Sequence, residues 1–363
     1  MELHHILAAL ENIAPLRAAE AWDNVGLLCG DPKQHVTRVM LTIDYTAAVA
    51  AEARDAACEL IIAYHPPIFD GLKRISAGSV IDDAIRRGVA IYSPHTALDI
   101  AEGGTNDMLA DALWLTDRAP LRLIENKARE YKLVTFVPEK DLDRVSDALF
   151  AAGAGRIGKY SACSFRSSGT GTFFGEEGTN PTVGKAGKLE QAPEQRLETV
   201  VPIANIAQVI AALRESHPYE EPAFDLVQLA APPSTSGQGR IGDFADAVER
   251  QVLLSRIKRE LGVEHLLVAG PIDGLVKRAA VCAGACGDLL DDALAQKADL
   301  YLTGEIRHHD AIKAASRGMT VVCTLHSNSE RPVLRRLAER LAEKLPELAI
   351  TISTADADPF RFF

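Results

Sequence analysis

Imidazole and carboxylate side chains follow several apolar runs of this sequence, and both types bind metal ions. The run IIAYHPPIF (61–69), for example, stops at a histidine that two prolines follow at once. The residues placed in this way are Asp44, His65, His95, Asp99, Glu305, His326 and Glu330. A lone histidine after a strand is usually a surface or turn residue, and a lone acid often caps the next helix. The repeated pattern, rather than any one residue, indicates a metal site.

The elements that carry these residues alternate between strand and helix patterns. Up to about residue 125, runs such as VTRVMLTID (36–44) and CELIIAY (58–64) read as strands, and VIDDAIRRG (80–88) reads as a helix that glycine ends. The same alternation returns near residue 275. Such βαβ units form parallel or mixed sheets, and ligands bind beyond the carboxyl ends of the strands. We therefore expect the polar side chains to meet at one sheet edge.

The ligand types narrow the choice of metal. Imidazole and carboxylate without cysteine suit Zn²⁺, Mn²⁺, Fe²⁺ or Ni²⁺ better than Ca²⁺ or Mg²⁺. We expect a divalent metal, one or two per subunit, with zinc as the first choice. In HSNSERP (326–332), Ser329 is expected to cap the next helix, which would put Glu330 at the helix N-terminus, where the helix dipole favours a carboxylate. There Glu330 could bridge two ions.

The middle of the chain has a different character. After residue 126 a strand–helix pattern leads into a stretch rich in glycine and threonine, then strand, helix and strand, and APPSTSGQGRIG (231–242) reads as a connector. We predict a discontinuous two-half α/β domain with mixed sheets, 1–126 and 233–363, interrupted by an inserted α+β ferredoxin-like domain, 127–232.

Several motifs, in order, resemble the GTP cyclohydrolase 1 type 2-like (Nif-three-like) family over nearly the whole chain. They are WDNVGL (22–27), YHPPIF (64–69), HTALDIAEGGTND (95–107), GEIRHHDA (304–311), HSNSE (326–330) and DPF (358–360). HPYEEPAFD (217–225) resembles the inserted PII/CutA-like domain of longer members. The resemblance implies a dinuclear metal site and a toroidal homohexamer. Carried over motif by motif, its ligands would be Tyr64, His65, Asp99, His326 and Glu330.

Tyr64 departs from the family pattern, which has a histidine there. A phenol with a pKa of about 10 is a poor ligand while neutral. The second metal could therefore bind weakly, use the Tyr64 oxygen or be absent. His95 and Glu305 could replace the missing ligand, but a role in orienting a ligand or binding substrate is favoured.

The resemblance favours a hydrolase that acts on a nucleotide-like, phosphoester or cyclic-amide substrate through metal-activated water. Glu305, His308 or His309 would carry the proton. The alternative is a metal-binding regulatory protein, not an enzyme, whose inserted domain senses a small ligand. An open metal position would favour the enzyme, and a closed one the regulator.

Two further motifs have structural interpretations. In WDNVG, Trp22 is expected to pack and residues 23–26 to turn, although a place near the metal cleft stays open. In HPYEEP the prolines are expected to shape a turn, while His217, Glu220 and Glu221 remain alternative ligands.

Composition limits the partners. The net charge of the 363 residues is −11, and no run is rich in lysine or arginine, so nucleic-acid binding is disfavoured. The six cysteines are scattered without a CxxC pair, and no signal peptide or membrane span is recognisable. We expect a cytoplasmic, homo-oligomeric protein that binds a small molecule.

Overall fold

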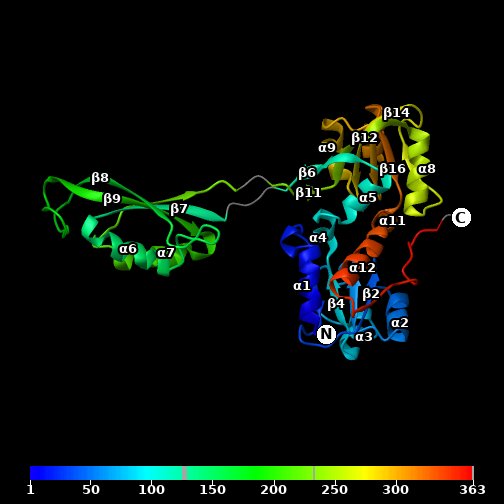
Figure 1. The fold of residues 1–363 in the computed structure, drawn as a ribbon, viewed down its shortest axis with the longest axis horizontal. Helices are drawn as coiled ribbons and strands as arrows, with labels where there is room; N and C mark the ends of the chain where they lie inside the picture. Colours follow the sequence, from blue (N-terminus) through cyan, green and yellow to red (C-terminus); the bar gives the residue numbers. More distant parts are fainter. Residues whose placement is uncertain (125–128, 232–233, 362–363) are drawn as a thin grey trace. The chain divides into compact units, whose positions relative to one another are not determined.

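The computed structural model describes residues 1–124, 129–231 and 234–361. The chain forms two compact units, one from Met1–Ile124 and Ser234–Phe363 and the other from Glu125–Pro233 (Figure 1). The expected domain boundaries, at 126–127 and 232–233, lie outside the described residues.

The first sheet of the α/β unit has five strands in the order β1-β4-β3-β2-β17. These are β1 (Gly26–Cys29), β2 (Arg38–Thr42), β3 (Leu60–Ala63), β4 (Ala90–Ser93) and β17 (Ala349–Ile352). The strands β2, β3, β4 and β17 run parallel, and β1 is antiparallel to β4. The last strand of the chain therefore completes a sheet that the first hundred residues begin.

The second sheet has six strands in the order β13-β16-β15-β14-β12-β5. They are β5 (Thr116–Ala119), β12 (Arg240–Glu249), β13 (Leu267–Ala269), β14 (Leu275–Cys282), β15 (Leu300–Thr303) and β16 (Thr320–Cys323). The strands β14, β15 and β16 are parallel, and the others join antiparallel. A small ribbon pairs β6 (Arg122–Leu123) with β11 (Gly237–Gln238). Because β5 and β17 each join the sheet of the other half, the two halves form one unit.

Helices cover both faces of each sheet, which explains why the inner strands β3, β4, β15 and β16 are buried throughout. In β3, Leu60 and Ile62 face α1 (Leu3–Ile13) and α12 (Pro332–Lys344), while Ile61 and Ala63 face α2 (Ala47–Asp55) and α3 (Val80–Arg87). On the second sheet, α5 (Thr105–Leu113) and α8 (Arg250–Leu261) cover one face, and α9 (Leu290–Ala295) and α10 (His308–Ser316) cover the other. These layers position the strand ends that form the site.

The inserted unit has the element order strand, helix, strand, strand, helix, strand. Its strands are β7 (Glu130–Val137), β8 (Ser164–Phe174), β9 (Leu189–Pro202) and β10 (Phe224–Gln228), and its helices are α6 (Leu142–Ala151) and α7 (Ile206–Ser216). The sheet is antiparallel in the order β10-β7-β9-β8. This is the ferredoxin-like pattern, so the predicted fold class is confirmed.

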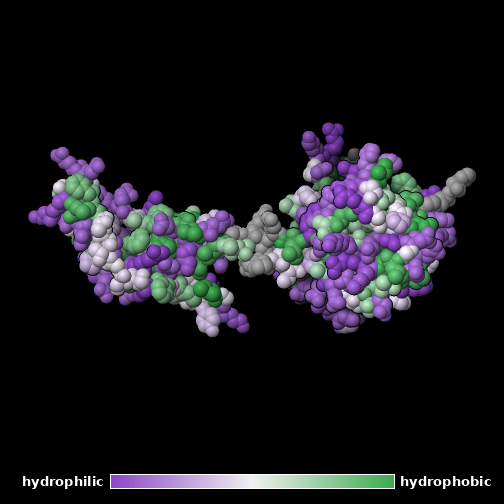
Figure 2. Space-filling view, turned by 90° about the horizontal axis from the view of Figure 1, so that it is seen from above, coloured by the Kyte–Doolittle hydropathy of each residue, from purple (hydrophilic) through white to green (hydrophobic). Residues whose placement is uncertain are grey.

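Figure 2 shows that hydrophilic side chains dominate the visible face of the α/β unit, with small hydrophobic areas among them. Within the described ranges no helix has the length and apolar character needed to cross a bilayer.

Candidate metal centre

His65 is fixed at the end of the central strand β3. Its backbone N–H donates to the carbonyl oxygen of Ile43 (3.0 Å), so sheet pairing continues past Ala63. Pro66 and Pro67 lack an N–H and cannot extend the ladder. The imidazole therefore projects from a backbone that the sheet holds on one side and the prolines on the other.

His326 and Glu330 come from the short helix α11 (His326–Glu330), which follows β16. Residues four apart share a helix face, and His326 Nε2 lies 3.2 Å from Glu330 Oε1. Leu325, directly before the helix, has φ +71°. Such a conformation costs a non-glycine residue on the order of 1–3 kcal/mol, and strain of this kind gathers at functional sites.

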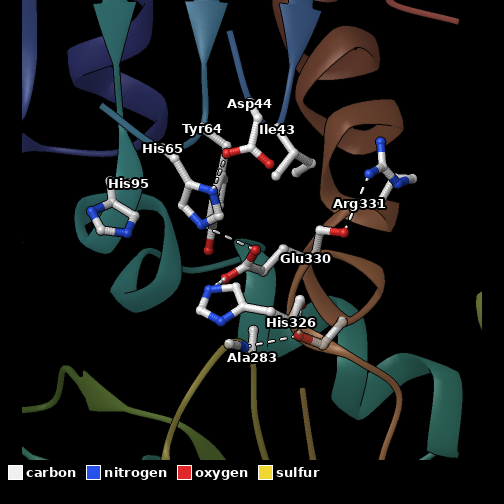
Figure 3. Close-up of polar contacts among 12 residues, drawn as sticks. Ile43, Asp44, Tyr64, His65, His95, Ala283, His326, Glu330 and Arg331 are labelled. Atoms are coloured by element: carbon white, nitrogen blue, oxygen red, sulfur yellow. Dashed lines mark hydrogen bonds and ion pairs between the residues drawn. The ribbon is translucent and has the colours of Figure 1, made fainter. Parts of the chain in front are cut away.

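The three side chains meet between the two sheets of the α/β unit. Figure 3 shows the rings of His65 and His326 on either side of the Glu330 carboxylate. One possible ligand atom from each residue lies within 4.8 Å of the others. His65 Nε2 lies 3.2 Å from Glu330 Oε2, yet within the described parts of the chain neither buried atom has a hydrogen-bond partner. Buried polar atoms are rarely left so, and a bound cation would satisfy both.

Two outer carboxylates orient the imidazoles. Asp44 Oδ1 lies 3.0 Å from His65 Nδ1, and Glu305 Oε1 lies 2.7 Å from His326 Nδ1. Because each Nδ1 is engaged, each Nε2 is left for the centre. Pairing of a ligating histidine with a carboxylate is the usual outer arrangement of metal sites.

The same contacts hold protons on the imidazoles of the metal-free protein. Burial alone would lower the pKa of His65, but Asp44 and Glu330 raise it to about 10. Contact with Glu330, and then Glu305, raises the pKa of His326 to about 9. Burial opposes ionisation of Glu330, but the two imidazoles lower its pKa. A cation at this place would replace these protons.

Two glycines let the second half of the unit approach the ligands closely. Gly284 has φ +73°, and a Cβ there would lie 2.8 Å from Glu330 Oε1 and 3.4 Å from His326 Nε2. A Cβ on Gly304 would lie 2.8 Å from Ser329 Oγ. Any larger residue at these positions would press on the centre.

The interpretation of Ser329 as a helix cap is wrong. Ser329 and Glu330 belong to α11 rather than to the start of α12. The Ser329 hydroxyl accepts from the N–H of Gly284 (2.8 Å) and donates to the carbonyl oxygen of His326 (2.6 Å). It therefore ties α11 to Gly284, and Glu330 ends α11 instead of opening α12 as we expected.

Tyr64, which is buried, and Asp99, which is half-buried, form a separate pair. The phenol donates to Asp99 Oδ1 and lies 3.3 Å from Thr105 Oγ1. Burial, followed by the Asp99 charge, raises the pKa of Tyr64 well above its usual value, and burial raises the pKa of Asp99 to about 6. The structure brings Asp99, on α4 (His95–Ile100), near the centre, but the three-ligand cluster does not include it.

His95 stands beside His65, with ring centroids 5.4 Å apart. Its φ is +26°, and its Nδ1 lies 2.8 Å from Asp23 Oδ1. The other Asp23 oxygen accepts from the N–H of Thr96 at 3.1 Å and from its hydroxyl at 2.5 Å. Burial would raise the pKa of Asp23, but His95 and Thr96 lower it. Asp23 thus fixes the orientation of a strained histidine.

A cavity of about 580 Å³ opens onto these groups. Its lining includes His65, His95, Asp99, His326, Glu330, Trp22, Phe69, Asn106, Gln238, Cys286 and Asp288. The interpretation of Trp22 as a packing residue is wrong, because its side chain is 60% exposed. It stands at the cavity instead, with its ring 6.0 Å from that of Phe69. The lining offers apolar, acidic and amide groups to a small molecule.

The remaining predicted residues lie further out. Glu305 is exposed and contacts His326, but within the described chain it does not itself line the cavity. His308 and His309 begin α10, are exposed, and contact one another with ring centroids 5.4 Å apart. Sequence reasoning named neither Asp44 nor Asp23 as a partner of a histidine. The only signals in the sequence were that Asp44 follows a strand and that Asp23 belongs to the WDNVG motif.

The fold and site together define a class, an α/β protein with a ferredoxin-like insertion and a His/His/Glu group able to bind a metal. The sequence matches the family described as Duf34/NIF3 (NGG1p interacting factor 3) over residues 1–359. It is 37% identical to a GTP cyclohydrolase 1 type 2 homolog of Halalkalibacterium halodurans over 364 residues, which cover 98% of each chain. The chain belongs to this family.

Solved structures of related proteins resemble this chain over its whole length. A Bacillus cereus protein related to NIF3 is 34% identical, with a TM-score of 0.69, over 100% of this chain and 99% of that one. A Staphylococcus aureus protein is 26% identical, with a TM-score of 0.76 and the same coverage.

Proposed function

We propose that the protein is a divalent-metal-dependent hydrolase. The observation that carries the proposal is the buried pair His65 Nε2 and Glu330 Oε2 beside the cavity, 3.2 Å apart but without a hydrogen bond among the described residues. The substrate class is a nucleotide-like molecule, a phosphoester or a cyclic amide, which the cavity would hold next to the ligands. We also propose, from the family resemblance, that the protein is a toroidal homohexamer.

The donor set fits a metal such as zinc, manganese, iron or nickel. His65, His326 and Glu330 would hold it, with Asp44 and Glu305 orienting the two imidazoles. A metal bound there would act as a Lewis acid and lower the pKa of a coordinated water. Three protein ligands leave one position open in a tetrahedral site, as in catalytic zinc centres.

The chain's own residues bind and orient the substrate. His95 lines the cavity, and because its Nδ1 faces Asp23, its Nε2 is left to make a hydrogen bond with a bound molecule. Trp22 and Phe69 offer aromatic surface on which a ring could rest. Glu305 is assigned an orienting role, and no proton transfer is proposed for His308 or His309.

The test is a panel of nucleotides, phosphodiesters and cyclic amides with protein loaded with Mn²⁺ or Zn²⁺. We expect turnover in the wild type, none in Glu330→Gln, and a lower kcat with unchanged metal content in His95→Gln. Absence of turnover on every class with both metals would rule out the hydrolase.

A second candidate function, ligand sensing by the inserted unit, is favoured by a different observation. That unit has its own cavity of about 560 Å³, lined by Phe136, Thr182, Glu194, Tyr219 and neighbouring residues. The Tyr219 hydroxyl donates to Glu194 (2.7 Å), and Thr182 donates to the carbonyl oxygen of Pro218 (2.7 Å), so the HPYEEP turn helps to close it. Thermal shifts with nucleotides, amino acids and polyamines, lost in Glu194→Ala, would support sensing.

A further inference from the structure

The hydrogen-bonded Tyr64–Asp99 pair bears on how many metal ions the centre holds. The dinuclear site that the family resemblance implies has a histidine ligand at position 64 and a carboxylate ligand at position 99. In this chain the phenol donates a hydrogen bond to Asp99 Oδ1; Tyr64 is fully buried, and Asp99 is half-buried where it lines the cavity. A phenol that keeps its proton is a poor ligand, and its bond takes up one of the two Asp99 oxygens.

Breaking the bond would be costly. A buried polar group left without a partner costs about 1–3 kcal/mol, and a charged one more. Tyr64 is only 1% exposed and is packed against the rings of His65 and His95, with centroids 5.3 and 5.7 Å away. It cannot turn away to make room for another ligand without disturbing those rings.

The remaining ligands form one compact set. His65, His326 and Glu330 offer atoms within 4.8 Å of one another, and Asp99 lies outside that set. The Glu330 oxygens are divided between the two imidazoles, each at 3.2 Å. This set can surround one ion, while on the other side Tyr64 offers a protonated phenol in place of a nitrogen ligand.

We propose that this protein holds one divalent metal ion per chain, on His65, His326 and Glu330, and that the Tyr64–Asp99 hydrogen bond replaces the second ion. The inference rests on the proposed metal site and deepens it. It makes the residue at position 64 the determinant of metal number in this chain.

Metal content per chain tests the proposal. Wild type, Tyr64→His and Asp99→Asn are each saturated with Zn²⁺, desalted and measured by elemental analysis against protein concentration, with circular dichroism as the folding control. We expect about one zinc in the wild type and in Asp99→Asn, and about two in Tyr64→His. Two in the wild type, or loss of zinc in Asp99→Asn, would overturn the single-ion proposal.

The metal site and the role of Tyr64 can be disproved separately. No zinc in the folded wild type would remove the proposed metal site itself, whereas two ions would remove only the role given to Tyr64. If Tyr64→His does not fold, the Asp99→Asn result still decides, because Asn keeps an acceptor oxygen for the phenol while it removes the carboxylate that a second ion would need.

Discussion

His65 Nε2 and Glu330 Oε2 face each other at 3.2 Å, although 265 positions separate them in the sequence (330 − 65). One atom comes from the end of a strand in the first sheet and the other from a helix that follows the second sheet. The site therefore exists only when the two halves of the α/β unit are assembled, and metal binding should stabilise that assembly.

Replacing the shared carboxylate should abolish metal binding. Loss of a partner that only orients a ligand typically costs 10–100-fold in affinity, so we expect Glu330→Gln to weaken binding by more than about 100-fold. Competition with a fluorescent zinc chelator measures this. Glu343→Gln, an exposed carboxylate on α12, is the matched control. Unchanged affinity in Glu330→Gln would contradict the assignment.

Removing an orienting carboxylate should have a smaller effect. In Asp44→Asn and Glu305→Gln the imidazoles keep a partner but lose its charge, and we expect about 10–100-fold weaker metal binding in each. The same chelator assay applies. If Glu305→Gln instead leaves affinity intact and abolishes turnover, Glu305 is a proton carrier, as one reading of the sequence suggested, and not an orienting group.

Metal binding should strengthen as pH rises. Near neutral pH the imidazoles of His65 and His326 are protonated, because their pKa values are about 10 and about 9. A metal must displace both protons, so apparent affinity should increase with pH up to about 9–10. Calorimetry in buffers of different ionisation enthalpy should detect the released protons at about pH 7.5. Release of none would contradict the pKa values.

The metal-free protein should lose stability over the same range. Both folded-state pKa values lie above the ordinary value of 6.5. The stabilisation that the two protonated imidazoles give the folded protein is therefore complete below about pH 6.5 and is lost as pH rises through about 9–10. Thermal unfolding of the metal-free protein measures this decline. Saturation with zinc, which holds the imidazoles deprotonated, should flatten it.

A methyl group at Gly284 should damage the site without removing a ligand. Gly284→Ala adds strain of about 1–2 kcal/mol from its positive φ, and its Cβ meets Glu330 Oε1. We expect lower Tm and weaker zinc binding. Gly318→Ala is the control, because φ is +77° there but no atom lies within 4 Å of the new Cβ. It should lower Tm and leave affinity unchanged. Equal losses of zinc affinity in the two variants would contradict the contact between the Gly284→Ala Cβ and Glu330.

The strand ends were predictable because both periodicity and chemistry mark them. β3 ends at Ala63, directly before Tyr64 and His65, and α3 is capped by Gly88, which has φ +66° as expected of a glycine in the left-handed region. The alternation also predicted mixed sheets and an inserted ferredoxin-like domain. These features follow from local patterns of apolar residues and turn formers.

The sequence did not predict which segments far apart in the chain pair with each other. No local pattern around Thr351 or Thr116 indicates that β17 and β5 join the sheets of the opposite halves. The bond between Asp23 and His95 likewise joins segments 72 positions apart. Trp22 looked like a core residue because its size favours burial, yet the cavity keeps it exposed. Such contacts depend on tertiary arrangement rather than on any local pattern.

The central claim is that His65, His326 and Glu330 bind one metal ion. An anomalous difference map from crystals of the zinc-loaded protein, recorded on both sides of the zinc absorption edge, tests it most directly. The account predicts one peak per chain, about 2.0–2.2 Å from His65 Nε2, His326 Nε2 and a Glu330 oxygen. No peak there, or a second peak bound by Tyr64 and Asp99, would contradict it.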